Sequence, residues 1–203
     1  MKIAIIGATG NAGTRLVAEA LRRGHEVTAI ARHPQKLTAL PKVIPRTGDV
    51  NEPDGLARLI TGHAAAITSV RLQSLNSRTV IAAARQAKLK PLLVVGGAGS
   101  LEVAPGVQLV DTPEFPAAYK AEALAARDCL NAQRSEENLE WTFLSPSAEF
   151  APGERTGKFR IGKDRLLTLP DGESKISMED FAIGMPDELE HAQHIRERFT
   201  VGY

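Results

Sequence analysis

The sequence predicts an α/β fold in which helices cover both faces of a doubly wound, mostly parallel sheet. Two observations support this prediction. Short apolar runs alternate with helical patterns along the chain, and a glycine-rich turn directly follows the first apolar run. No internal repeat, low-complexity tract or linker interrupts this alternation.

The individual elements can be placed along the chain from this pattern. Strands are expected at Lys2–Ile6, Glu26–Ala31, Val43–Arg46, Ala65–Val70, Leu92–Val95 and Trp141–Leu144. Helices are expected at Asn11–Arg23, Asn76–Ala87 and Ala121–Ala132. The strand at Val43–Arg46 has the weakest pattern, because Pro45 cannot donate a hydrogen bond to a sheet ladder.

The first helix has one apolar stripe, which consists of Leu16, Val17, Ala20 and Leu21. Its charged residues fall outside this stripe: Arg15, Glu19, Arg22 and Arg23. The helix is therefore expected to pack by one face and to end at Gly24.

Two irregular segments, 96–116 and 146–164, each follow a strand. Open α/β sheets bind ligands at the carboxyl ends of their strands, so both segments are expected to border a ligand site. The remaining elements are a strand at Arg165–Leu169, a turn at Pro170–Gly172, a helix at Met178–Glu190 and a strand at Arg198–Val201. Pro186 is expected to kink or split that helix. Residues from about 146 to 203 would form a small substrate-side lobe.

Length, composition and charge limit the classes of protein to be considered. A chain of 203 residues with 43% hydrophobic and 24% charged residues can bury one core, so a single domain over 1–203 is expected. The formal charge is +1 and no basic block occurs, which argues against nucleic acid and membranes as partners. A small-molecule ligand is expected instead, with a homodimer as the ordinary assembly.

The start of the chain and its cysteine content both favour a cytoplasmic protein. The first apolar stretch is short and runs straight into the glycine turn, unlike a signal peptide or a spanning helix. Cys129 is the single cysteine, so neither a disulfide framework nor a thiolate metal site is expected. Cys129 is expected to be a packing residue.

A glycine fingerprint lies between the first strand and the first helix. Gly7 would permit the tight turn, Gly10 would let a pyrophosphate approach the main chain, and Gly13 would allow close helix packing. A turn kept only for chain reversal is the alternative, and the surrounding βαβ pattern disfavours it. The expected nucleotide contacts are Gly7, Thr9, Gly10, Asn11, Ala12 and Gly13. The fold class is therefore Rossmann-like, with a nicotinamide dinucleotide as ligand.

The residue after the second strand distinguishes NAD from NADP. An acidic side chain there would pair with the ribose 2′-hydroxyl of NAD, but this chain has Arg32. A guanidinium can bind a 2′-phosphate with two parallel hydrogen bonds, so NADP is expected as the cofactor and NADPH is preferred over NADH. A solvated loop arginine is the alternative.

Other residues at strand ends are expected along the cofactor path: Asp49, Val50, Thr68, Ser69, Val70, Gly96, Gly97 and Pro146. Asp49 could accept from the adenine amino group while Val50 packs on the ring, although a helix-capping Asp49 is equally consistent. Gly96 and Gly97 would let the nicotinamide lie against the chain, with a plain loop exit as the alternative.

Several motifs resemble the atypical short-chain dehydrogenase/reductases: GATGNAG, GDV, VVGGAGSLEV, YKAEAL, WTFLSP and RFTVGY. The chain looks most like the small NmrA-like group often labelled NADH-flavin reductases, over essentially its whole length. The resemblance implies a Rossmann-like sheet of about seven strands, an NAD(P) cofactor and hydride transfer to a flavin or similar conjugated acceptor. Members of the broader group include redox-sensing regulators that bind the nucleotide without evident turnover.

One motif departs from the typical members of that superfamily, which use Tyr-x-x-x-Lys with the tyrosine as acid/base. Here Tyr119 and Lys120 are adjacent, and they are the candidate catalytic residues. Lys120 stands about where the family's lysine would be, which leaves Pro116 at the tyrosine position. Lys120 could then bind the nicotinamide ribose, whereas Tyr119 is expected to be a partly buried aromatic residue at a helix start.

The function that these observations predict is an NAD(P)H-dependent reductase, NADPH-linked, of a flavin such as FMN or FAD, a quinone or a similar flat acceptor. A conjugated ring delocalises the incoming charge, so hydride transfer needs ring positioning more than a protein acid. A non-catalytic NADP-binding redox sensor is the alternative. An isomerase or dehydratase is disfavoured by the small lobe after residue 150.

Overall fold

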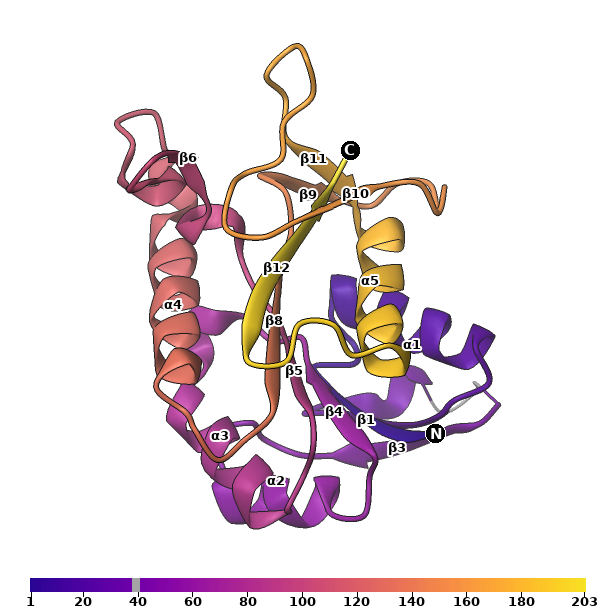
Figure 1. Ribbon diagram of the computed structural model, residues 1–203. Helices are drawn as coiled ribbons and strands as arrows, with labels where there is room; N and C mark the ends of the chain where they lie inside the picture. Colours follow the sequence, from indigo (N-terminus) through magenta and orange to yellow (C-terminus); the bar gives the residue numbers. More distant parts are fainter. Residues whose placement is uncertain (38–40) are drawn as a thin grey trace.

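The computed structural model describes residues 1–37 and 41–203, in which an eight-stranded sheet lies between two layers of helices (Figure 1). Its strands are β1 (Lys2–Ile6), β2 (Glu26–Ala31), β3 (Val43–Thr47), β4 (Ala65–Thr68), β5 (Leu92–Val95), β8 (Trp141–Ser145), β10 (Arg160–Gly162) and β12 (Glu197–Gly202). They follow the order β10-β12-β8-β5-β4-β1-β2-β3, and only β10 is antiparallel to its neighbour. The predicted Rossmann-like α/β fold is confirmed.

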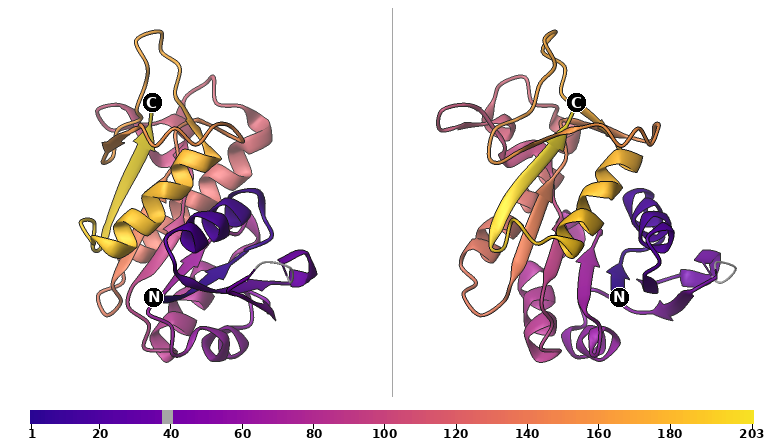
Figure 2. Two further views of the ribbon diagram at one scale, coloured as in Figure 1. Left: turned by 90° about the vertical axis from the view of Figure 1, so that its right-hand side faces the viewer. Right: turned by 45° about the vertical axis from the view of Figure 1, so that its right-hand side comes forward.

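The helices divide between the two faces of the sheet (Figure 2). They are α1 (Asn11–Arg22), α2 (Pro53–Ile60), α3 (Ser77–Gln86), α4 (Ala117–Arg134) and α5 (Met178–Glu190). Alternate residues of each strand point to opposite faces, so Ile3 and Ile5 join the core under α1 and α5. Ala4 and Ile6 join the core under α2, α3 and α4. In the described part of the chain, no helix is long and apolar enough to span a bilayer.

The expected strand that contains Pro45 is present as β3, and its position explains why proline is tolerated there. β3 lies at one end of the strand order and pairs with β2 alone, with Pro45 opposite Ala29. An edge strand can leave one side of its ladder unpaired, so a missing N–H there breaks no second ladder.

The expected strand at Arg165–Leu169 is wrong: the structure has a single bridge there, between Glu102 and Arg165. Short strands lie in the two segments that were expected to be irregular: β6 (Glu102–Ala104), β7 (Val107–Gln108) and β9 (Glu149–Ala151). A further short strand, β11 (Lys175–Ser177), lies between the expected turn and the last helix, where no element was expected. Two or three residues are too few to show an alternating pattern. Four single-turn 3₁₀ helices complete the description: Pro34–Leu37, Leu72–Ser74, Ala98–Ser100 and Leu109–Asp111.

Pro186 neither splits α5 nor ends it, because the helix runs from Met178 to Glu190. Met185 and Glu188, on either side of the proline, are both buried. Packing against the sheet and α1 therefore maintains a helix that lacks one backbone hydrogen bond.

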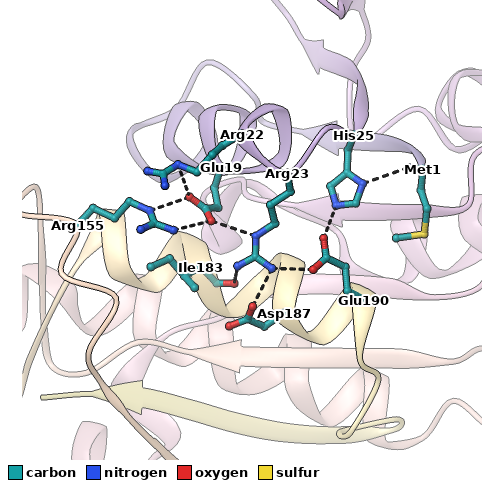
Figure 3. Close-up of polar contacts among 9 residues, drawn as sticks. All are labelled: Met1, Glu19, Arg22, Arg23, His25, Arg155, Ile183, Asp187 and Glu190. Carbon is teal, nitrogen blue, oxygen red and sulfur yellow. Dashed lines mark hydrogen bonds and ion pairs between the residues drawn. The ribbon is translucent and has the colours of Figure 1, made fainter.

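A buried charge network joins α1 to α5 and includes Glu19, which lies outside the apolar stripe of α1 (Figure 3). The Glu19 carboxylate is 4% exposed and accepts hydrogen bonds from Arg155 at 2.9 Å and Arg23 at 3.0 Å. Arg23 continues to Asp187 at 2.7 Å and Glu190 at 2.9 Å on α5. Burial would raise the pKa of the Glu19 carboxyl, but the hydrogen bonds from the two arginines outweigh it and lower that pKa.

Glu19→Gln keeps the shape of this side chain and removes its charge. We expect the variant to lose about 2 kcal/mol of unfolding free energy at neutral pH, because Arg23 and Arg155 lose a buried partner. Arg22→Gln is the matched control, since the Arg22 side chain is 55% exposed, and it should cost about 0.5 kcal/mol or less. Urea unfolding measures both values.

The lowered pKa also fixes the pH dependence of this difference. The Glu19 contribution is present above the unfolded-state value, about 4.3, and is lost as pH falls through the lower folded-state pKa. The stabilities of Glu19→Gln and the wild type should therefore converge in acid. Equal losses from the two variants, or a gap that persists in acid, would contradict this account.

Candidate nucleotide-binding site

The glycine turn lies where the order of the sheet reverses, between β1 and β4. Gly7 has φ +81°, and a Cβ built on it would lie 2.3 Å from the Ser69 carbonyl oxygen. A Cβ on Gly13 would lie 2.1 Å from the Gly7 carbonyl oxygen. Both positions therefore require glycine, Gly7 for the turn and Gly13 for the approach of α1 to the turn.

Gly10 has a different role from the other two glycines. It is exposed and is the N-cap of α1, and no side chain caps the helix there. The first turn of α1 contains no acidic residue, so its N–H groups and the positive end of its dipole face an open surface. The side chains of Thr9 and Asn11 have no hydrogen-bond partner among the residues that the structure describes. This cradle is suited to phosphate oxygens.

Arg32 directly follows β2 on the same edge of the sheet and is exposed. No described carboxylate pairs with it, so its guanidinium can meet an anionic ligand. Asp49, after β3, accepts a hydrogen bond from the Asn51 backbone N–H at 2.9 Å. It forms a local turn and does not cap α2, whose N-cap is Glu52. Val50 packs against the core beneath α2 and α3.

The ends of β4 and β5 form a wall beside the glycine turn. Thr68 is 1% exposed, and its hydroxyl has no partner within the described residues. The Ser69 carbonyl and the Val70 side chain are the atoms closest to a Cβ on Gly7. Gly96 is required by packing, because a Cβ there would lie 2.0 Å from the Phe143 ring.

Gly97, Ala12 and Pro146 occupy three other predicted contact positions. Gly97 is the N-cap of a 3₁₀ helix, and Ala12 lies half-buried in the first turn of α1. Pro146 is buried immediately after β8. The neighbouring Ser147 hydroxyl donates to the Val201 carbonyl at 3.0 Å, which ties the ends of β8 and β12 together.

The candidate catalytic pair lies in the first turn of α4. Tyr119 is 68% exposed, so the expectation of a partly buried aromatic residue is wrong. Lys120 is also exposed, and neither side chain has a described hydrogen-bond partner. Ser100, the first serine after β5, is the other hydroxyl considered as an acid/base group; it is 2% exposed and accepts a hydrogen bond from the buried Arg198 at 3.3 Å. The structure therefore provides no assembled acid/base pair at this position.

Two carboxylates that organise this region were not predicted. Glu122, one turn along α4, accepts from the backbone N–H groups of Leu72 at 2.6 Å and Gln73 at 3.1 Å. It fixes α4 against the segment that follows β4. No sequence motif distinguishes it from an exposed helical glutamate.

Asp180, in the first turn of α5, is fully buried and accepts from Thr156, the Gly157 N–H and the Tyr203 hydroxyl. The Ser177 hydroxyl accepts from the Asp180 N–H at 3.0 Å, which makes Ser177 the N-cap of α5. The three-residue spacing between Ser177 and Asp180 at the start of a helix was the signal in the sequence that could have indicated this cap. Asp180 thereby fixes the segment at residues 153–157, through Thr156 and Gly157, against the start of α5.

Comparison with known proteins identifies the family of the chain. Residues 7–192 match the model of a family described as NAD(P)H-binding. The chain belongs to this NAD(P)H-binding family. The match begins at Gly7, the first residue of the cradle.

Three solved structures are similar to this NAD(P)H-binding chain over its whole length. One, from Streptococcus pneumoniae, is named as a proposed NADH-flavin reductase. It is 38% identical to this chain, with a TM-score of 0.86, and the match covers 99% of its length. A second, from Bacteroides thetaiotaomicron, is named as a proposed epimerase and is 40% identical, with a TM-score of 0.95 and 96% covered. The third, from Burkholderia pseudomallei, is named as a proposed exported protein and is 44% identical, with a TM-score of 0.91 and 100% covered.

The cradle fits the nucleotide of this family on its own geometry. Gly7 and Gly13 leave no space for a Cβ, while the surface at Gly10 is open and the helix end is uncapped. These features are those that a pyrophosphate requires at a helix N-terminus. Among the described residues, no group of three His, Cys, Asp or Glu side chains could hold a metal ion.

Gly13→Ala should weaken nucleotide binding at least tenfold. The added methyl group would displace the Gly7 carbonyl and with it the turn. Gly55→Ala, on α2, is the control, because Gly55 likewise lies in the first turn of a helix without a positive φ, and an added Cβ there would come no closer than 3.4 Å to a neighbouring atom. Titration of the nicotinamide nucleotide measures both variants; an undiminished affinity in Gly13→Ala would show that the turn does not hold the pyrophosphate.

Proposed function

We propose that this protein is an NADPH-linked reductase that transfers hydride to a flavin, a quinone or a similar flat acceptor. The observation that carries the proposal is an open nucleotide cradle beside a helix start that lacks an assembled Tyr–Lys pair. Tyr119 is 68% exposed, and Pro116 is the N-cap of α4. Reduction of an isolated ketone needs a placed proton donor, whereas a conjugated ring does not.

The preference for NADPH is supported by the charge after β2. Arg32 is exposed and unpaired among the described residues, and no acid occupies the position that would bind the 2′-hydroxyl of NAD. Its planar guanidinium suits a 2′-phosphate. Asp49, half-buried with one oxygen engaged by Asn51, remains our proposal for the adenine contact.

When bound, the reduced nicotinamide would supply the hydride, and the protein residues would hold the nicotinamide ring and the acceptor in place. The N–H groups at the start of α1 would bind the pyrophosphate, and Lys120 would bind the nicotinamide ribose. Thr68 and Pro146, both buried, would form walls that keep the ring in one plane and exclude water. The acceptor would stack on the exposed side, a small molecule being the expected partner.

The two functional names among the related structures point to different chemistries. An epimerase that uses a bound nicotinamide nucleotide must remove a hydride from one carbinol carbon and return it to the opposite face, which needs a positioned acid/base group for the hydroxyl proton. Ser100 is buried against Arg198, and Tyr119 faces solvent. This arrangement supports the reductase.

The first experiment is anaerobic NADPH consumption by the purified protein with FMN, riboflavin and small quinones. NADH and a protein-free blank run beside each acceptor. Turnover well above the blank supports the reductase and ranks the acceptors. Tight NADPH binding without turnover on any acceptor would contradict the reductase proposal and support the non-catalytic redox sensor instead.

Arg32→Glu should reverse the preference between NADPH and NADH, because an acid repels the 2′-phosphate and accepts from a 2′-hydroxyl. A shift of at least tenfold in the ratio of the two affinities is expected, about 1.4 kcal/mol. Arg58→Glu, at an exposed position on α2, is the charge-matched control and should leave the ratio unchanged. An unchanged ratio of the two affinities in Arg32→Glu would show that Arg32 does not bind the 2′-phosphate.

Tyr119→Phe should leave flavin reduction within about twofold of the wild type, since no protein acid is required. Lys120→Gln should raise the KM for NADPH more than it lowers kcat, because Lys120 is proposed to bind the ribose. Steady-state kinetics with FMN test both variants. A large fall in kcat for Tyr119→Phe, with NADPH binding intact, would mean that its hydroxyl acts on the acceptor.

A cytoplasmic location remains our proposal. The single cysteine, Cys129, is buried, and burial raises the pKa of its thiol to about 12, so it is an unreactive packing residue. One related structure is named as a proposed exported protein, so cell fractionation is the direct measurement.

A further inference from the structure

A cavity of about 230 Å³ lies at the amino ends of β8 and β12. Its wall includes Trp141, the first residue of β8, Arg198 near the start of β12, and Arg134, the last residue of α4. The strands are parallel, and the glycine turn follows the carboxyl end of β1. The cavity is therefore at the opposite edge of the sheet from the nucleotide cradle.

Cations outnumber carboxylates in the wall of this cavity. The four cations are Arg134, Lys163, Arg196 and Arg198, and the two carboxylates are Asp164 and Glu197. One oxygen of Asp164 serves two arginines, with Arg134 at 3.2 Å and Arg198 Nε at 2.8 Å. Lys163 lies 3.3 Å from Glu197. An excess of two positive charges remains.

Arg196 is the cation that the wall leaves unpaired. It makes no ion pair with any described residue. Its backbone has φ +58°, and its N–H donates to the Trp141 carbonyl at 2.7 Å. The main chain thus anchors this arginine beside Trp141 at the start of β12.

Trp141 provides an independent indication of a ligand. The residue is 2% exposed, yet its indole N–H finds no acceptor in the part of the chain that the structure describes. The indole nitrogen can only donate, so a carboxylate-like or phosphate-like oxygen would satisfy it. A buried donor without a partner is rare in folded proteins.

We propose that this cavity binds a small phosphate group, either inorganic phosphate or the phosphate of a monoester. A dianion matches the excess of two positive charges, and its tetrahedral oxygens can accept from the indole, Arg196 and Arg134 at once. The cavity is smaller than the range of about 300–1,000 Å³ that is typical of drug-sized ligands, which favours a small anion. The site is independent of the proposed reductase activity.

Trp141 is the single tryptophan of the chain, so its fluorescence reports on this cavity alone. Inorganic phosphate and glycerol 3-phosphate are titrated in parallel, with chloride holding the ionic strength constant. A saturable change in emission is expected with at least one of them. The stronger ligand identifies the source of the phosphate group. No saturable change with either would mean that water satisfies the indole, and the proposal would fail.

Arg196→Asn removes the unpaired cation, and asparagine tolerates the positive φ at this position. We expect at least a tenfold loss of phosphate affinity. Lys88→Asn is the matched control: it removes one exposed cation from a residue with φ +54° outside the cavity, and its affinity should be unchanged. Similar titrations for the two variants would indicate non-specific charge and would overturn the site.

Trp141→Phe tests the indole donor by calorimetry, since it keeps an aromatic ring but removes the N–H. Phosphate binding should weaken at least fivefold in the variant. An unchanged affinity would exclude the indole as a ligand and would also overturn the proposal. Thermal unfolding without phosphate checks that the variant is folded.

Discussion

The contact between the Gly7 carbonyl and Gly13 is the constraint on which the rest of the structure depends. A Cβ on Gly13 would approach that oxygen to 2.1 Å, so α1 can lie against the turn only because the side chain is absent. The same turn packs on the Ser69 carbonyl at the end of β4. One small segment therefore joins β1, β4 and α1, and it leaves the start of α1 open at the point where the sheet reverses its order.

The position of α1 then determines how the C-terminal lobe is held. Glu19 presents a buried carboxylate to Arg23 and Arg155, and Arg23 reaches α5. Asp180, on α5, binds the same 153–157 segment through Thr156 and Gly157. The segment is thus fixed by carboxylates from two helices, each of which accepts several hydrogen bonds away from water. The position of α1 beside the glycine turn therefore also determines where residues 155–157 lie.

Sequence patterns predicted the parts of this structure that depend on periodicity or on backbone sterics. The long strands, the main helices and the positions of Gly7 and Gly13 belong to this class. The burial of Glu19 was not predicted, because helical periodicity separates apolar from polar faces and a buried ion pair departs from that pattern. The three-residue strands and the exposed Tyr119 depend on tertiary contacts that no local window contains. Glu122 and Asp180 lie in the same category, since their partners are 23 to 50 residues away.

The two proposed ligand sites share one strand but differ in what they require of it. β8 begins at Trp141 and ends at Ser145, and all five of its residues are buried. It spans about 17 Å, at about 3.3 Å per residue, so its two ends face separate solvent regions. At the carboxyl end, Pro146 is proposed as a wall for the nicotinamide ring, a role that needs shape more than charge. The amino end gathers cations around an indole N–H, which needs charge more than shape. Because the strand is hydrogen-bonded to β5 and β12 on both sides, it cannot slide without breaking both ladders. A ligand at one end should therefore leave the geometry of the other end unchanged, and the sheet keeps the two kinds of chemistry apart.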